Sequence, residues 1–173
     1  MKRIYKFDDN DSVVFRGDGE PRTAKTLLSR LNEFTENHQL LDDDFSLGGL
    51  VGQLENEMAA IRGKPAAIFR PTGTLANHLA IRRHAGTAGR AVVQEQSHIF
   101  NDTGDSIQRL SGINLVPLAP NRVYFDTNEL DKAYTTSVTG RVLNPISVVS
   151  IETPVRRQYG QVVAWKHLVQ LTK

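Results

Sequence analysis

The chain contains no cysteine, and it lacks several other features that would point directly to a function. Without cysteine there are no disulfides, no thiolate metal sites and no cysteine nucleophile. The formal net charge is only +2 and no dense block of Lys or Arg occurs, so no nucleic-acid or membrane partner is expected. No apolar run could span a bilayer, and residues 1–8 lack the apolar core of a signal peptide. We therefore expect a cytoplasmic protein.

Nucleotide-binding and metal-binding motifs are also missing. Neither Gly-x-x-x-x-Gly-Lys-Ser/Thr nor Gly-x-Gly-x-x-Gly occurs anywhere in the sequence. His78 and His84 are six positions apart, so they do not share a helix face as metal-binding histidines at i and i+4 do. The sequence predicts neither an ATP or NAD loop nor a metal site.

The most informative segment that is present covers residues 63–77. It predicts a short apolar strand at 66–69, a turn, and a helix that opens at Thr74. A turn of this kind, with Thr72, Gly73 and Thr74, presents free backbone N–H groups at a helix start and suits a phosphate group. An ordinary helix N-cap by Thr72 or Thr74 is the alternative, and the pattern alone favours it.

The rest of the chain alternates between helical and strand patterns. Apolar periodicity predicts helices at residues 23–37, 50–62, 75–85, 127–134 and 165–171, and strands at 66–69, 91–93, 113–118 and 146–151. The last strand is continuously apolar, and we expect it to be buried. This alternation predicts an α/β fold with a mostly parallel sheet covered on both faces, in one domain or part of one.

Ligands of such sheets bind at the carboxyl ends of the strands, where polar loops are expected at residues 70–74, 94–105 and 152–160. In the second loop, His98 could act as an acid or base or lie flat on an aromatic ligand, although a lone loop histidine is more often a surface residue. In the third, Arg156 and Arg157 could clamp a carboxylate, or could form a solvated basic turn; these two interpretations carry equal weight.

Five segments, taken together in this order, resemble the threonine aldolase / β-eliminating lyase family of pyridoxal phosphate enzymes. They are residues 49–59 (GLVGQLENEMA), 63–69 (GKPAAIF), 71–77 (PTGTLAN), 95–99 (EQSHI) and 110–113 (LSGI). The resemblance implies a three-layer α/β/α fold, namely part of the large domain of the type I pyridoxal-phosphate-dependent transferase fold. It also implies a homo-oligomer that cleaves the Cα–Cβ bond of a β-hydroxy amino acid, giving glycine and an aldehyde.

The resemblance also assigns roles to individual residues. It implies that Thr72, Gly73 and Thr74 hold the phosphate of pyridoxal phosphate. It further implies that His98 stacks on the pyridine ring and is the catalytic residue assisting proton transfer at the substrate hydroxyl. Asp18 falls where the family has an Arg-Ser-Asp segment near the substrate.

Two departures from the family pattern concern the substrate. Gly17 stands where the family has Ser beside the equivalent of Asp18. Val155 stands where the family has a substrate-contacting histidine, and the neighbouring Arg156 could supply a different substrate contact.

A third departure concerns the cofactor. In the family, an Asp that pairs with the pyridine nitrogen and a lysine that links covalently to the cofactor follow the helix that Trp165 begins, and the chain ends at Lys173 before both. We therefore expect residues 1–173 to form an incomplete cofactor-binding large domain that binds the cofactor phosphate without efficient turnover. The alternative is a non-catalytic module that binds a partner or subunit through exposed apolar edges.

Overall fold

The computed structural model describes residues 23–45, 47–86 and 89–172. The chain divides into two compact units, Met1–Phe69 and Arg70–Lys173, and each is considered by itself. The predictions for Asp18 and its neighbours lie outside the described residues. Within the described part, every helix is too short or too polar to cross a bilayer.

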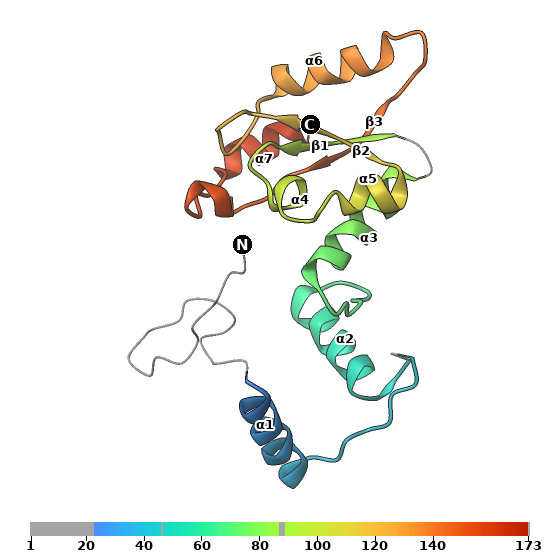
Figure 1. Cartoon of the computed structure of the whole chain (residues 1–173), viewed down its shortest axis with the longest axis vertical. Helices are drawn as coiled ribbons and strands as arrows, with labels where there is room; N and C mark the ends of the chain where they lie inside the picture. The colour runs from blue at the N-terminus through green and yellow to red at the C-terminus, as the bar shows by residue number, and fades with distance from the viewer. Residues whose placement is uncertain (1–22, 46, 87–88, 173) are drawn as a thin grey trace, which may run out of the picture. The chain divides into compact units, whose positions relative to one another are not determined.

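The first unit contains two helices, α1 (Ala24–Asn37) and α2 (Gly49–Arg62), close to the positions predicted (Figure 1). The Thr23 hydroxyl caps α1 by accepting a hydrogen bond from the Thr26 N–H at 3.1 Å. Gly63 ends α2 with a φ of 59°, in the left-handed region where glycine is favoured. Local capping chemistry therefore fixes where α1 begins and where α2 ends.

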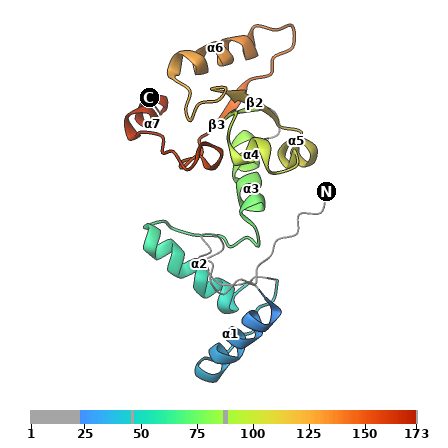
Figure 2. The same cartoon turned by 60° about the vertical axis from the view of Figure 1, so that its left-hand side comes forward.

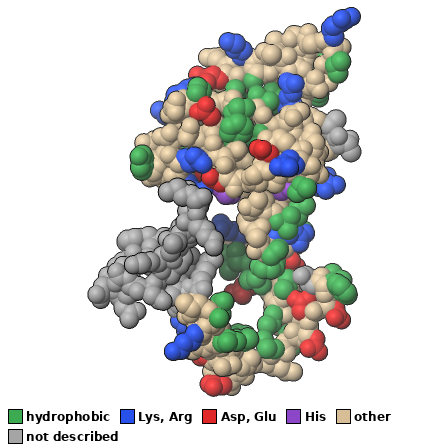
Figure 3. Space-filling model, viewed as in Figure 1, with side chains coloured by type: hydrophobic (Ala, Val, Ile, Leu, Met, Phe, Trp, Pro, Cys, Tyr) green, Lys and Arg blue, Asp and Glu red, His purple; other side chains and the backbone are tan. Residues whose placement is uncertain are grey.

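Both helices of this unit expose apolar side chains (Figure 3). Helix α1 has no buried residue, and Leu27 on its apolar stripe is 62% exposed. On α2 only Ala59 is buried, while Ile61 is 67% exposed. The apolar periodicity thus located the helices correctly, but the stripes stay exposed to solvent in this chain.

The predicted strand at residues 66–69 is wrong. These residues form no strand, and the Phe69 N–H donates to the Glu55 carboxylate at 2.7 Å instead of to a neighbouring strand. A four-residue apolar run is compatible with several conformations, and it becomes a strand only where a partner strand is within reach.

The second unit is built around a parallel sheet of three strands in the order β2-β1-β3 (Figures 1 and 2). The strands are β1 (Arg90–Gln94), β2 (Asn114–Leu118) and β3 (Ile146–Ser150). At the middle of the sheet, Val92 pairs with Val116 on one side and with Val149 on the other. The predicted α/β fold with a parallel sheet is confirmed.

Helices cover both faces of this sheet. One face packs against α3 (Gly73–Ala85), α4 (His98–Asn101) and α5 (Ser106–Ser111). The core on that face consists of Ile81, Ala85, Ala91, Val93, Ile99, Ile107 and Ile113. On the other face Val92, Ala119 and Phe125 pack with side chains of α6 (Thr127–Val138) and α7 (Trp165–Leu171). The unit is therefore a three-layer α/β/α sandwich, as expected.

The central position of β1 creates a switch point in the sheet. The chain leaves β1 for α4 and α5 on one face, whereas it leaves β3, a neighbour of β1 in the sheet, for α7 on the other face. Where the connections from two neighbouring parallel strands leave on opposite faces, a crevice opens between the carboxyl ends of those strands. Here that crevice lies between the ends of β1 and β3.

The expectation that β3 is fully buried is wrong. Its side chains alternate between half-buried and exposed, and Val149 is 40% exposed. Among the described residues β3 pairs with β1 alone, so it lies at the edge of the sheet and is covered less than the central strand. Continuous apolar character does not distinguish an edge strand from a central one.

The pairing of β1 with β3 contains an irregularity. Arg90 pairs with Ile146 but Ala91 pairs with Val148, which leaves Ser147 as an extra residue in β3. Gly89 adopts a φ of 139° beside this bulge, and a Cβ at that position would collide with the Ser147 side chain. Only glycine fits there without strain.

We expect Gly89→Ala to lower the free energy of unfolding by about 2–4 kcal/mol, because it combines a disfavoured φ with a steric collision. Urea unfolding would measure the change. Gly112→Ala is the matched control, since Gly112 has a φ of 66° but no described atom lies within 4 Å of the point that its Cβ would occupy. The control should cost about 1–2 kcal/mol, and equal losses in the two variants would contradict the proposed collision.

Candidate functional site

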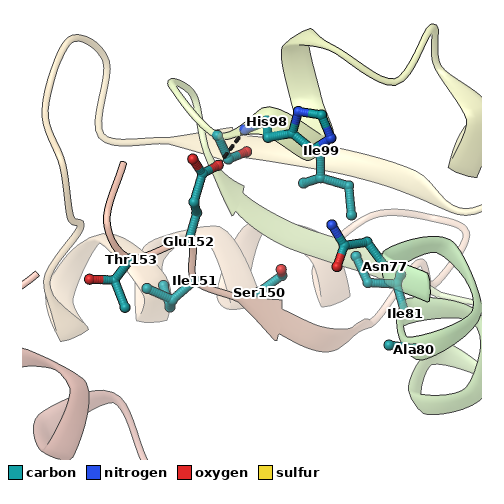
Figure 4. A pocket seen from close by; sticks show the side chains of 10 residues that line it. Asn77, Ala80, Ile81, His98, Ile99, Ser150, Ile151, Glu152 and Thr153 are labelled. Carbon is teal, nitrogen blue, oxygen red and sulfur yellow. Dashed lines mark hydrogen bonds between the residues drawn. The ribbon is translucent and has the colours of Figure 1, made fainter. Parts of the chain in front are cut away.

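A pocket of about 340 Å³ lies in the second unit, at the crevice between the ends of β1 and β3 (Figure 4). Three segments line it. They contribute Asn77, Ala80 and Ile81 from α3, then Ser97, His98 and Ile99 from the start of α4, and Ser150, Ile151, Glu152 and Thr153 from the end of β3. The pocket occupies the place where parallel sheets bind ligands.

The pocket combines an apolar floor with polar groups around it. Ile81 and Ile99 belong to the buried core and are 4% and 7% exposed. Asn77, His98 and Glu152 come from three different elements and surround the cavity (Figure 4). Such a lining suits a small ligand that has a flat apolar body and polar substituents.

Gln94, the last residue of β1, joins the segments that form the pocket. Its side chain is fully buried, and its Nε2 donates to the carbonyl of Val123 at 2.7 Å and to the carbonyl of Glu152 at 2.9 Å. Its Oε1 accepts from the Glu152 N–H at 2.7 Å. This role of Gln94 was not predicted from the sequence, although a polar residue that ends a short apolar strand is a usable signal.

The carboxylate of Glu152 continues this connection toward α4. It accepts a short hydrogen bond from the His98 backbone N–H through Oε2. Through Oε1 it accepts from the Arg156 N–H at 3.0 Å. Glu152 therefore fixes the start of α4 against the loop that follows β3. Its role was not predicted either, since only its place in the polar loop at 152–160 marked it.

Asp102 lies one turn after His98 and forms an ionic cluster with the loop after β3. Arg156 Nη2 donates to its Oδ2 at 2.5 Å, and Arg157 Nη2 donates to its Oδ1 at 2.8 Å. The imidazole Nδ1 of His98 lies 3.5 Å from the same Oδ2. The hydrogen bond from Arg157, and after it that from Arg156, lowers the pKa of Asp102 to about 2, although burial acts in the opposite direction.

The first turn of α3 carries the predicted phosphate-binding residues. The Thr72 hydroxyl accepts from the Leu75 N–H at 3.1 Å, so the N-cap interpretation of Thr72 is confirmed and the helix begins at Gly73. Among the described residues, the N–H groups of Gly73 and Thr74 have no hydrogen-bond partner. No described atom lies within 4 Å of where a Gly73 Cβ would stand, so the space beside this residue is open.

The structure thus brings some of the sequence-predicted residues together. His98 lines the pocket, whereas Thr72, Gly73 and Thr74 do not; Asn77, one turn after Thr74 on the same helix face, is the first residue of α3 that lines it. Arg156 does not line the pocket and is bonded to Asp102. Asp18 lies outside the described residues. Among the described residues, no cluster of three or more His, Asp or Glu side chains is arranged to hold a metal ion.

Comparison with known proteins identifies the family. The model of the beta-eliminating lyase family matches residues 33–173. The chain belongs to this family. The beta-eliminating lyase match covers the whole second unit, including the pocket. It therefore confirms the resemblance that the sequence motifs indicated.

Two proteins with similar sequences are named aldolases. The chain is 28% identical to aldolase vrtJ of Penicillium aethiopicum over 142 residues, which cover 82% of this chain and 36% of that protein. It is 30% identical to low-specificity L-threonine aldolase 1 of Arabidopsis thaliana over 104 residues, which cover 60% of this chain and 28% of that protein. The chain spans about a third of the length of these relatives.

Solved structures share the fold. A protein assigned as an L-allo-threonine aldolase of Listeria monocytogenes superposes with a TM-score of 0.68 at 26% identity, over 86% of this chain and 39% of that one. A protein assigned as an aromatic amino acid beta-eliminating lyase/threonine aldolase of Exiguobacterium superposes with a TM-score of 0.70 at 19% identity. That match covers 88% of this chain and 40% of the other, and it supports the fold alone.

We expect Gln94→Met, which keeps the length of the side chain, to lower the free energy of unfolding by about 3 kcal/mol or more. The reason is that buried backbone groups of Val123 and Glu152 would lose their partners. Chemical denaturation would measure the loss. Gln170→Met on the exposed surface of α7 is the control and should change stability by less than about 0.5 kcal/mol. A loss at Gln94 no larger than the control would disprove the bridging role.

The lowered pKa of Asp102 predicts an acid-sensitive contribution to stability. Its pKa of about 2 in the folded state lies below the ordinary 3.8, so the ion pairs stabilise the fold above about pH 4 and are lost as the pH falls toward 2. Because both arginines are partly exposed, we expect a contribution of only about 1 kcal/mol.

Denaturation curves recorded from neutral to acidic pH would test this contribution. Asp102→Asn should lose less stability than the wild-type chain as the pH falls, whereas the control Asp131→Asn should follow the wild-type profile. Parallel pH profiles for wild type and Asp102→Asn would show that the ion pairs add nothing.

Proposed function

We propose that this chain supplies the cofactor-binding part of a pyridoxal-phosphate-dependent lyase. The reaction proposed is cleavage of the Cα–Cβ bond of a β-hydroxy amino acid, which yields glycine and an aldehyde. The observation that carries the proposal is the pocket at the switch point, where His98 and the helix that begins at Gly73 meet in a beta-eliminating lyase chain. The relatives named as threonine aldolases support the substrate class.

The start of α3 fits a phosphate group. The N–H groups of Gly73 and Thr74 are available as donors, and α3 is 13 residues long, so its dipole favours an anion at this end. The first turn carries no acidic residue that would repel the phosphate. We assign the phosphate to Gly73 and Thr74, with Thr72 acting as the cap that holds the turn in place.

The pocket fits the pyridine ring of the same cofactor. Ile81 and Ile99 offer an apolar surface, and the half-buried imidazole of His98 stands at the wall. When bound, pyridoxal phosphate supplies an electron sink for the charge that develops at the substrate Cα. His98 is proposed to stack on the ring and to exchange a proton with the substrate hydroxyl through Nε2, the nitrogen that does not face Asp102.

Arg156 is proposed as a contact of the substrate carboxylate. Its Nη2 is bonded to Asp102, but the side chain is 66% exposed, so its other donors can reach a second anion. Asp18 remains a proposed substrate contact on the family resemblance alone. The homo-oligomer and the lack of efficient turnover by these 173 residues likewise stay predictions.

We expect the chain to bind pyridoxal 5′-phosphate more tightly than pyridoxal, because only the former carries the phosphate. The Thr74 hydroxyl is proposed as a further donor to the phosphate, so Thr74→Ala, which removes it and keeps the backbone N–H, should weaken binding of pyridoxal 5′-phosphate about tenfold, as expected for one charge-assisted hydrogen bond. It should leave binding of pyridoxal unchanged. Equilibrium dialysis with absorbance detection would measure both affinities.

Thr127→Ala is the matched control for this experiment. Thr127 also lies in the first turn of a helix, but its helix is capped by Asp126, whose charge does not favour phosphate. The control should bind both compounds as the wild type does. Equal affinity of the wild-type chain for the two compounds would overturn the assignment of the phosphate site.

A further inference from the structure

Ser97 occupies the N-cap position of α4 without performing the usual function of that position. A capping serine normally accepts a hydrogen bond from a backbone N–H of the first turn through its hydroxyl. The Ser97 hydroxyl makes no such bond. The residue is 1% exposed and is one of those that line the pocket.

The Glu152 carboxylate, and not the Ser97 hydroxyl, is the side-chain acceptor at the start of α4. The Glu152 carboxylate reaches across from the end of β3 and accepts the hydrogen bond of the His98 N–H. The Ser97 carbonyl is occupied as well, since it accepts from the Asn101 Nδ2 at 2.9 Å. Only the hydroxyl remains, and among the described residues its oxygen has no hydrogen-bond partner.

A buried hydroxyl without a partner is unfavourable, and most buried serines avoid this state. Ser137, which is 3% exposed, donates its hydroxyl to the Tyr134 carbonyl at 2.7 Å. Ser97 has no comparable bond within the described part of the chain. Ser97 differs from Ser106, whose buried hydroxyl also lacks a partner in the described part of the chain, in that it lines the pocket, so a group that enters the pocket is the candidate partner.

We propose that the Ser97 hydroxyl binds a polar substituent of the ligand held in this pocket. The inference rests on the proposed function, because pyridoxal phosphate is the flat ring assigned to the cavity. The oxygen substituents and the nitrogen of that ring accept hydrogen bonds, so Ser97 acts as the donor. The His98 N–H, the first of α4, already has its acceptor in the Glu152 carboxylate.

The test compares Ser97→Ala with Ser106→Ala and Thr72→Ala. Ser106 is half-buried and its hydroxyl oxygen is buried without a partner among the described residues, but it does not line the pocket. The Thr72 hydroxyl is a working cap, so its variant reports the stability loss of a bonded hydroxyl. Urea unfolding and binding of pyridoxal 5′-phosphate would be measured for each chain.

We expect Ser97→Ala to keep the wild-type unfolding midpoint and to bind pyridoxal 5′-phosphate about tenfold more weakly, the loss expected for one buried hydrogen bond. Ser106→Ala should keep both properties, and Thr72→Ala should lower the midpoint. The inference is overturned if Ser97→Ala unfolds as early as Thr72→Ala or fails to fold, since the hydroxyl would then have a structural partner.

Unchanged binding by Ser97→Ala would also overturn the inference, while the proposed cofactor would stand. A wild-type chain that does not bind pyridoxal 5′-phosphate would overturn the proposed function itself, before any variant is compared. The two failures are therefore distinguishable.

Discussion

The side-chain amide of Gln94 is the contact on which the architecture of the pocket depends. In a parallel sheet the connections can leave the strand ends on opposite faces, and the hydrogen bonds between the strands do not hold those connections together. Gln94 links them, because its buried side-chain amide forms hydrogen bonds with the carbonyl and the N–H of Glu152 and with the carbonyl of Val123. A hydrocarbon side chain of the same size would pack equally well but would leave all three groups unpaired.

The carboxylates of Glu152 and Asp102 extend this hydrogen-bond network from Gln94 to α4. Gln94 fixes the backbone of Glu152, and the Glu152 carboxylate accepts hydrogen bonds from the N–H groups of His98 and Arg156. Asp102 closes the loop by bonding the arginine side chains back to the helix that begins at His98. The His98 imidazole is thus held through the backbone N–H of His98 and through Asp102 one turn later. These contacts restrict the side chain that is proposed to stack on the pyridine ring.

What the sequence could predict follows from the range of the interactions. The caps at Thr23, Thr72 and Gly63 involve residues a few positions apart, so they depend on local sequence; the pattern predicted the cap at Thr72, although it placed Thr23 inside its helix. His98 was predictable because it follows a strand of a parallel sheet. By contrast, the bonds that Glu152 makes with Gln94 and His98 join residues more than 50 positions apart, and no local pattern contains the register that brings them together. The failed strand at 66–69 has the same origin, since strand formation depends on a partner.

The extra residue at Ser147 decides which side chains of β3 reach the pocket. Successive strand side chains point to opposite faces, so one inserted position inverts the phase of everything after it. With Ser147 accommodated beside Gly89, Ser150 pairs with Val93 and shares the face that α3 covers. A strand of regular spacing would send Ser150 to the opposite layer and a neighbour into its place. The polarity of the cavity wall is in this sense encoded as a count of residues, so loss of the bulge with Ser147 retained in the ladder would alter the chemistry of the pocket without replacing any residue that lines it.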